Sequence, residues 1–162
     1  MAVNTLKEKF TGQLPLVYFS ELQFIEAQQK MIANATDPTL KSGLEKHLEE
    51  TKQHAVNLEQ VFMSLGLKPE QKECPICMGL VKSGESAMKE AGTDALRDVA
   101  IGGAGVLVEH YEIAAYRGLV AQATALGLTD ATQLLQQNLQ QEEQTAQKME
   151  EAAPMLMQKA AA

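Results

Sequence analysis

The chain lacks the features of several common protein classes. It has no tryptophan, only 4% aromatic residues and only two cysteines among its 162 residues. Two cysteines are too few to hold together a secreted disulfide scaffold, and in a reducing compartment we expect both to remain thiols. The composition is instead rich in Ala, Gln, Glu, Leu and Met. This composition favours helices over a sheet and predicts an all-α protein.

The chain also lacks targeting and membrane signals. Residues 1–9 contain no apolar core of a signal peptide, and no apolar run approaches the roughly 20 residues needed to span a bilayer. Its 21 acidic and 14 basic residues give a net charge of −7, and the basic residues are scattered. This distribution excludes the basic patch that nucleic acid or an anionic membrane would require. We therefore expect a cytoplasmic protein whose acidic surface attracts cations.

Helical periodicity and capping residues predict four long helices and one short helix. Pro15 and Pro38 each suit the first turn of a helix, and Gly66 and Gly127 each suit a left-handed cap at a helix end. Pro154 is expected to kink or end the last helix. The predicted long helices cover residues 15–34, 38–65, 94–126 and 130–157, and the short helix covers residues 75–90.

The lengths of the connections predict the topology. Short turns at residues 35–37 and 127–129 make two antiparallel helix pairs, whereas the long stretch from 66 to 92 must connect the second long helix to the third. A single long crossover containing a short extra helix predicts a ferritin-like four-helix bundle. We interpret residues 1–162 as one such domain.

Four glutamates interrupt or flank the apolar stripes of the predicted long helices. Because antiparallel helices rise equally from a shared turn, Glu26 and Glu50 lie roughly 10 and 13 residues from the first turn, and Glu112 and Glu142 lie roughly 15 and 14 from the second. All four therefore reach similar layers in the middle of the bundle. Burying one ionised carboxylate costs several kcal/mol, so several that converge on one core imply bound cations. Two divalent ions would offset the charge of four carboxylates.

Two further side chains extend this predicted site. His54 lies one turn beyond Glu50 on the same face, and Glu109 lies one turn from Glu112. Added nitrogen and oxygen ligands of this kind favour Fe or Mn over Ca. The alternatives are that His54 is a helix-face histidine bonded to a neighbour and that each glutamate is solvated. His47 is interpreted as structural or exposed.

Other polar side chains are expected to have supporting or surface roles. We expect His110 to support the site or to face solvent, and Glu143 to point about 100° away from Glu142 and therefore outward. Cys74-Pro-Ile-Cys77 has the spacing of a redox or metal pair and stands at a predicted helix start, where the helix dipole lowers a thiol pKa. No second pair completes a zinc site, and no strand precedes the motif as in thioredoxin-like proteins. We interpret these as structural or incidental thiols, with a redox role as the alternative.

Several strings carry a specific family resemblance. Residues 47–51 (HLEET), 108–116 (VEHYEIAAY) and 139–143 (LQQEE), with Ile25-Glu26 upstream, resemble the YciF-like family, a bacterial stress-associated branch of the ferritin-like superfamily. The resemblance covers nearly the whole chain. It implies a ferritin-like four-helix bundle with an extra crossover helix, often dimeric, and a di-metal centre. The positions that match the family's acidic residues are Glu26, Glu50, Glu109 or Glu112, and Glu142.

The chain departs from the usual ferritin-type pattern, which pairs a glutamate with a histidine three residues later on two helices. Here Glu50 is followed three residues later by Gln53, with His54 one position further, and Glu142 is followed by Thr145. At most one conventional pair remains.

Two functions follow from these observations. The first is a di-metal protein with two Fe or Mn ions that handles peroxide, oxygen or the metal itself during stress. If this protein is an enzyme, it is a peroxidase-like or catalase-like oxidoreductase. The alternative is a metal-free helical dimer that serves as a structural or interaction module. A homodimer is expected in both cases.

Overall fold

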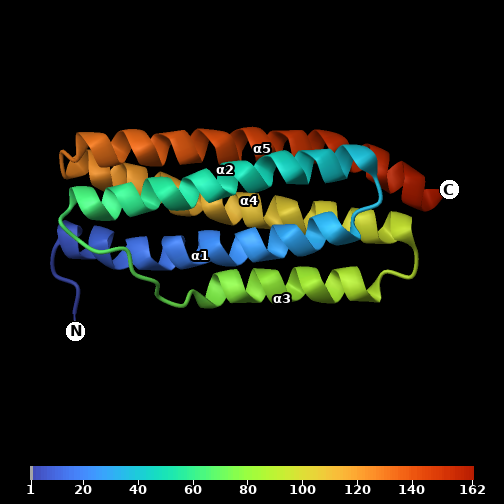
Figure 1. Ribbon diagram of the computed structural model, residues 1–162, viewed down its shortest axis with the longest axis horizontal. Helices are drawn as coiled ribbons and strands as arrows, with labels where there is room; N and C mark the ends of the chain where they lie inside the picture. Colours follow the sequence, from blue (N-terminus) through green and yellow to red (C-terminus); the bar gives the residue numbers. More distant parts are fainter. Residues whose placement is uncertain (1) are drawn as a thin grey trace.

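The computed structural model describes residues 2–162, which form a bundle of helices. Four long helices make the bundle, and the shorter α3 packs on its outside against α1 and α4 (Figure 1). This confirms the predicted all-α bundle. The helices are α1 (Leu6–Asn34), α2 (Pro38–Ser64), α3 (Pro75–Glu90), α4 (Asp94–Ala125) and α5 (Thr129–Ala161).

The long helices form two antiparallel hairpins, α1 with α2 and α4 with α5. The hairpins dock so that α2 packs on α5 and α1 packs on α4. Because α2 ends at the opposite end of the bundle from the start of α4, the chain must travel back along its length, and residues 65–74 followed by α3 do so (Figure 1). The connection between the hairpins is the single long crossover that the sequence predicts.

Capping groups hold the helix ends as their sequence signals indicate. The Asp37 carboxylate accepts hydrogen bonds from the backbone N–H groups of Thr39 and Leu40, both at 2.9 Å, just before Pro38 in the first position of α2. After α2 and α4, Gly66 and Gly127 adopt φ angles of 71° and 68°, the left-handed conformation that glycine permits. The turns that set the antiparallel pairing are therefore encoded locally.

Helix α1 begins earlier than predicted, and Pro15 lies inside it. The true start is a capping box in which Thr5 accepts from the backbone of Glu8, while the Glu8 side chain accepts from the backbone of Thr5. An interior proline costs a helix about 3 kcal/mol. The extra turns offset this cost because they bury side chains such as Phe10, which is 0% exposed. The predicted start at Pro15 is wrong because tertiary packing outweighs the local signal.

Helix α5 likewise continues through Pro154 to Ala161. Leu156, two residues after the proline, is buried against the bundle and holds the last turns in place. Across the part of the chain that the structure describes, each helix is too short or too polar to cross a lipid bilayer.

Two apolar clusters fill the ends of the bundle and leave a polar layer between them. One cluster is built around Phe10, Leu58 and Leu119, and the other around Leu44 and Ile101. Each of these five side chains is at most 1% exposed. The apolar clusters shield the middle layer from water, and the groups buried in that layer must find their partners there.

Candidate metal centre

The middle layer contains six buried ionisable side chains that come from all four long helices. Each is at most 1% exposed. Helix α2 supplies two histidines seven residues apart, and α4 supplies two glutamates three residues apart, spacings that place each pair on one helix face. The six are Glu21 on α1, His47 and His54 on α2, Glu109 and Glu112 on α4, and Glu142 on α5.

These side chains form two groups that share one member. One group is His47, Glu109, Glu112 and Glu142, and the other is Glu21, His54 and Glu142. Within each group, one potential ligand atom per residue lies within 4.8 Å of the others. The shared Glu142 directs its Oε1 to His54 Nδ1 at 2.8 Å and its Oε2 to His47 Nε2 at 3.6 Å. Glu142 therefore presents one oxygen to a member of each group.

Each histidine turns one ring nitrogen toward its group and the other toward an outer partner. His47 Nε2 lies 3.1 Å from Glu109 Oε1, and its Nδ1 contacts Thr145 Oγ1 at 3.2 Å and Glu50 Oε2 at 3.4 Å. His54 presents Nδ1 inward, and its Nε2 lies 2.8 Å from Gln141 Oε1. Metal-binding histidines are oriented in this way by the group that holds their second nitrogen.

A chain of hydrogen bonds also orients Glu21. The Tyr116 hydroxyl donates to Glu21 Oε1 and accepts from Asn138 Nδ2 at 3.0 Å. Asn138 in turn accepts from Asn57 Nδ2 at 2.7 Å. The chain ties one oxygen of Glu21 to three helices and leaves Oε2 free.

Several buried polar atoms in this layer have no hydrogen-bond partner. His54 Nδ1 is at ion-pair distance from Glu142, but the two groups lack the alignment of a hydrogen bond. Each unpaired buried atom costs about 1–3 kcal/mol. Because these atoms converge on one place, the layer could hold a positively charged partner. The carboxylate atoms concerned are Glu21 Oε2, Glu109 Oε2, and both oxygens of Glu112 and of Glu142.

The local electrostatics explain how the layer is neutralised without a cation. Burial raises the pKa of Glu21 and of Glu142 to about 7, and burial with the nearby Glu142 charge raises the pKa of Glu112 well above its usual value. Burial lowers the pKa of both imidazoles, but the adjoining carboxylates outweigh it. The pKa of His54 rises to about 9, and that of His47 rises well above its usual value. Proton binding to these side chains would therefore compete with the binding of a cation.

The donor set fits two divalent transition-metal ions. Four carboxylates and two imidazoles match the ligand set of ferritin-like di-iron and di-manganese proteins. Mixed carboxylate oxygen and imidazole nitrogen donors of this kind could hold a metal ion. The distribution differs from the usual one, because both histidines come from α2 and no Glu-x-x-His pair contributes.

The structure brings together most of the predicted site residues. Glu109, Glu112, Glu142 and His54 all lie in the two groups. Glu50 lies at the edge, where its side chain is 21% exposed and contacts His47. The hydrogen bond with His47 lowers the pKa of Glu50. Glu50 is therefore placed to support a ligand from outside the two groups.

Glu26 is a wrong prediction, because its side chain is exposed. The buried series on α1 runs through Phe10, Leu14 and Val17 at helical spacing, and its next member is Glu21. Phe10 and Leu14 belong to the helix only when it begins before Pro15, and the series that they start then predicts that Glu21 points inward.

His47, interpreted as structural or exposed, is buried in the centre and belongs to one of the two groups. Its position on the same apolar stripe as Leu44 and Thr51 was the available signal. Two expected surface residues are exposed: His110 pairs with Glu150 and Glu143 pairs with Arg117, both at 2.6 Å.

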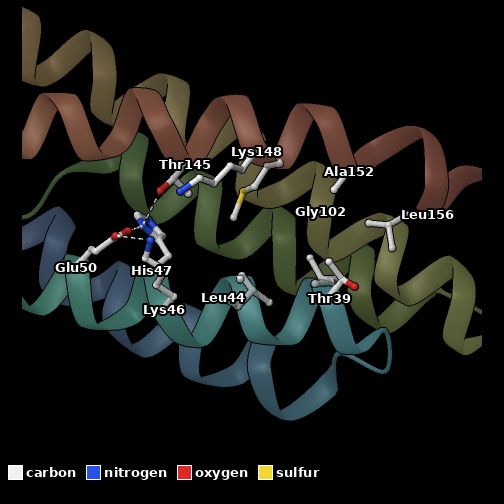
Figure 2. A pocket seen from close by; sticks show the side chains of 13 residues that line it. Thr39, Leu44, Lys46, His47, Glu50, Gly102, Thr145, Lys148, Ala152 and Leu156 are labelled. Carbon is white, nitrogen blue, oxygen red and sulfur yellow. Dashed lines mark hydrogen bonds and ion pairs between the residues drawn. The ribbon is translucent and has the colours of Figure 1, made fainter.

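An apolar groove leads to this layer from the surface. It lies between α2 and α5, has a volume of about 290 Å³, and ends at His47 and Glu50 (Figure 2). Leu44, Met149 and Leu156 line its walls, and Lys148 reaches toward the polar end. A small molecule entering the groove would meet His47 first.

Comparisons with known proteins place the chain among bacterial relatives. The family model described as a domain of unknown function, DUF892, matches residues 5–162. Protein YciF of Escherichia coli K12 is 30% identical over 154 residues, which is 94% of this chain and 93% of that protein.

Solved structures share the fold. The structure described as that of the E. coli stress protein YciF has a TM-score of 0.91 and 30% identity, and the match covers 97% of this chain and 99% of that one. A protein from Rhodopseudomonas palustris, described as "YcfI, a putative structural protein", has a TM-score of 0.89 and 37% identity over 91% of this chain and 94% of its own. A Xanthomonas campestris protein at 23% identity and a TM-score of 0.78, over 98% of this chain and 100% of its own, shares the fold.

Proposed function

Because the chain belongs to the DUF892 family and buries six converging ionisable side chains, we propose that it binds two Fe or Mn ions in its middle layer and handles peroxide or oxygen there. The observation that carries this proposal is the set of unpaired carboxylate oxygens that converge at the centre of the bundle. The enzymatic form of the proposal is a peroxidase-like or catalase-like oxidoreductase.

Each of the two groups would hold one ion, and Glu142 would contribute an oxygen to each. When bound, such ions supply one-electron redox chemistry that no protein side chain in this layer provides. The protein's own part is to orient the ligands. Thr145 and Glu50 fix the His47 ring, Gln141 fixes the His54 ring, and Tyr116 fixes Glu21.

The groove that leads to the middle layer and the description of a relative support a small oxidant as the reactant. The surface of the groove that ends at His47 is mainly apolar, so the groove admits a small molecule while limiting bulk water. The E. coli relative is described as a stress protein. A stress role in the bacterial cytoplasm, as a homodimer, is part of the proposal.

A second function is favoured by a different observation. The R. palustris relative is described as structural, and α4 and α5 expose large apolar side chains such as Leu107 and Met157, each 58% exposed. Exposed apolar groups of this size mark interaction surfaces when they are contiguous. The second candidate is a metal-free helical dimer that acts as a structural or interaction module.

Metal analysis separates the two functions. We expect untagged protein, expressed in medium supplemented with iron and manganese, to contain about two transition-metal ions per chain, in line with its two ligand groups. Elemental analysis for Fe, Mn and Zn measures this content, and peroxide consumption is then followed at defined loading. Protein that carries no metal above the level of a metal-free reference would support the structural module instead.

Filling the groove should slow the reaction without removing the metal. A Cβ built on Gly43 meets no other atom within 4 Å, so a leucine at this position can extend into the groove it lines. We expect Gly43→Leu to reduce peroxide consumption severalfold at unchanged metal content. The matched control is Gly79→Leu, a helical glycine on α3 with equally open surroundings and no place in the groove. Equal loss in both variants would contradict the groove as the entry route.

A further inference from the structure

We propose that Cys74 and Cys77 form a second reactive site, a dithiol that reduces a hydroperoxide and closes to an intramolecular disulfide. The two cysteines lie at the start of α3, and neither belongs to the six-residue centre. This site needs no metal ion, so it goes beyond the function proposed above. Both cysteines are free thiols in the structure.

The backbone brings the two thiols to one side of a helix start. Cys74 is the N-cap residue of α3, with φ −108° and ψ 107°, and Cys77 lies three residues later in the first turn. Residues at this spacing have Cβ atoms about 5–6 Å apart, and a disulfide requires about 3.5–4.5 Å. Bond closure therefore needs a shift of one or two ångströms. Cys74 has an extended backbone and follows the non-helical residues 65–74, so this shift can occur outside α3.

Both cysteines are buried, but Cys74 is 5% exposed and lines a surface hollow, whereas Cys77 does not. Cys74 and Tyr111 line a surface hollow of about 490 Å³ between the first turns of α1, the crossover and α4. Cys77 is 0% exposed and packs beneath, in an apolar cluster with Phe24 and Val108. A small oxidant in the hollow therefore reaches Cys74 and not Cys77. This order assigns Cys74 as the attacking thiol and Cys77 as the resolving thiol.

A hydrogen-bond chain is placed to stabilise the attacking thiolate. The Tyr111 hydroxyl lies 3.1 Å from Cys74 Sγ and 3.1 Å from Ser20 Oγ. A hydroxyl can accept from a thiol or donate to a thiolate, so Tyr111 can serve both protonation states of Cys74. The side chains of Lys9 and Lys72 also line the hollow, together with one carboxylate, that of Glu8. The excess of positive charge favours a thiolate there.

The acidities of the two thiols agree with these roles. Burial opposes ionisation of Cys74, but the hydrogen bond with Tyr111 and nearby backbone N–H groups outweighs it, and the pKa of Cys74 is lowered. Burial raises the pKa of Cys77 to about 11. The accessible thiol is thus the more acidic one.

The reaction balances without a further reactant. The Cys74 sulfur attacks hydrogen peroxide, an S–O bond forms as the O–O bond breaks, and the leaving hydroxide takes the thiol proton to become water. The Cys77 sulfur then attacks the sulfenic acid, an S–S bond forms as the S–O bond breaks, and the second hydroxide leaves as water with the Cys77 proton. In total, one dithiol and one hydrogen peroxide give one disulfide and two waters. A cellular dithiol reductant would restore the thiols by exchange.

The test uses the full chain after metal removal, so that its outcome is independent of the metal centre. We expect stoichiometric hydrogen peroxide to remove both thiols together, with a loss of two hydrogen atoms in mass and a peptide that joins Cys74 to Cys77. In Cys77→Ser, dimedone should capture a sulfenic acid on Cys74, whereas in Cys74→Ser the Cys77 thiol should persist. Circular dichroism checks that each variant is folded. Retention of both thiols in folded wild-type protein, under conditions that oxidise the urea-unfolded chain, would overturn the proposal.

Tyr111 is assigned as a positioning residue for Cys74. Loss of one hydrogen bond to a charged group corresponds to about a tenfold effect, so we expect Tyr111→Phe to slow thiol oxidation about tenfold. The matched control is Tyr18→Phe, because the Tyr18 hydroxyl donates to Glu59, away from the thiols. Equal oxidation rates in the two variants, at equal melting temperature, would remove Tyr111 from the site.

Discussion

Replacement of Glu142 by glutamine is expected to remove bound metal while leaving the protein folded. Glu142 is the one side chain that faces both ligand groups, so the change weakens both at once. Loss of supporting groups alone costs metal sites about 10–100-fold in affinity, and loss of a shared ligand should exceed this range. Elemental analysis should therefore find less than one ion per chain in Glu142→Gln.

The same substitution should leave the metal-free protein folded, with some loss of stability below about pH 9, where protonated His54 loses its carboxylate partner. Glutamine preserves the shape of the side chain and removes a fully buried carboxylate whose ionisation burial already opposes. Chemical denaturation in the presence of a chelator measures this. A variant that is already unfolded in the absence of denaturant would lose metal for that reason alone, and that result would contradict the assignment.

Two matched pairs of variants control for the loss of charge. Glu143→Gln changes the next residue, which is exposed and pairs with Arg117, and it should retain both ions. On α1, Glu21→Gln should lose metal and Glu26→Gln should not, because only Glu21 is buried in the layer. The reverse result on α1 would favour the assignment made from sequence alone.

The metal-free protein is expected to lose stability as the pH rises from about 4.5 to about 9. The pKa of Glu21 and of Glu142 is about 7 in the folded protein and 4.5 ordinarily, so the folded state binds more protons than the unfolded state between these values. His54, with a pKa of about 9 in the folded protein against 6.5 ordinarily, adds stability that is complete below 6.5 and is lost as the pH rises through 9. Both effects have the same sign.

The expected loss of stability can be estimated from the pKa shifts of these groups. One pKa unit corresponds to about 1.4 kcal/mol, and because the groups are coupled we expect a total loss of about 3 kcal/mol rather than the sum of the separate shifts. Carboxylates with a lowered pKa, such as Asp37 beside Lys159, change the stability of the fold only below this pH range. Urea denaturation at several pH values with a chelator measures the free energy of unfolding.

Metal ions should reverse the trend. Ligands must lose their protons to bind a cation, so at saturating manganese the protein should gain stability as the pH rises through the same range. Glu142→Gln provides the control, because it should flatten the metal-free dependence and abolish the reversal. A metal-free wild type that becomes more stable between pH 5 and 9 would contradict the proposed protonation of this layer.

The sequence predicts the helices and their order well because those signals are local. Asp37 with Pro38, and the glycines at positions 66 and 127, set the helix ends that define the hairpins. The crossover length then leaves few topologies open. The failure at Pro15 has a tertiary cause, since the burial of Phe10 and its neighbours holds the first turns of α1 in a helix despite the proline.

The candidate site was harder to predict than the fold, because the identity of an inward residue depends on the phase of its helix. Glu26 was predicted from its distance to the turn at residues 35–37, but the inward face of α1 carries Glu21, five residues earlier on the same helix. Counting residues from each turn predicted the height of the polar layer along the bundle. The rotation of each helix about its own axis decides which side chain points into that layer. His47 was misjudged because its partners, such as Glu109, come from the other hairpin.

The division of the six side chains between the two hairpins has a consequence for how the protein matures. Glu21, His47 and His54 belong to the first hairpin, and the other three belong to the second. Each group draws on both hairpins, so neither half of a nascent chain holds a complete ligand group. If the protein binds metal as proposed, capture of an ion would wait until the two halves have docked, and a newly made chain would sequester no metal before its fold is finished.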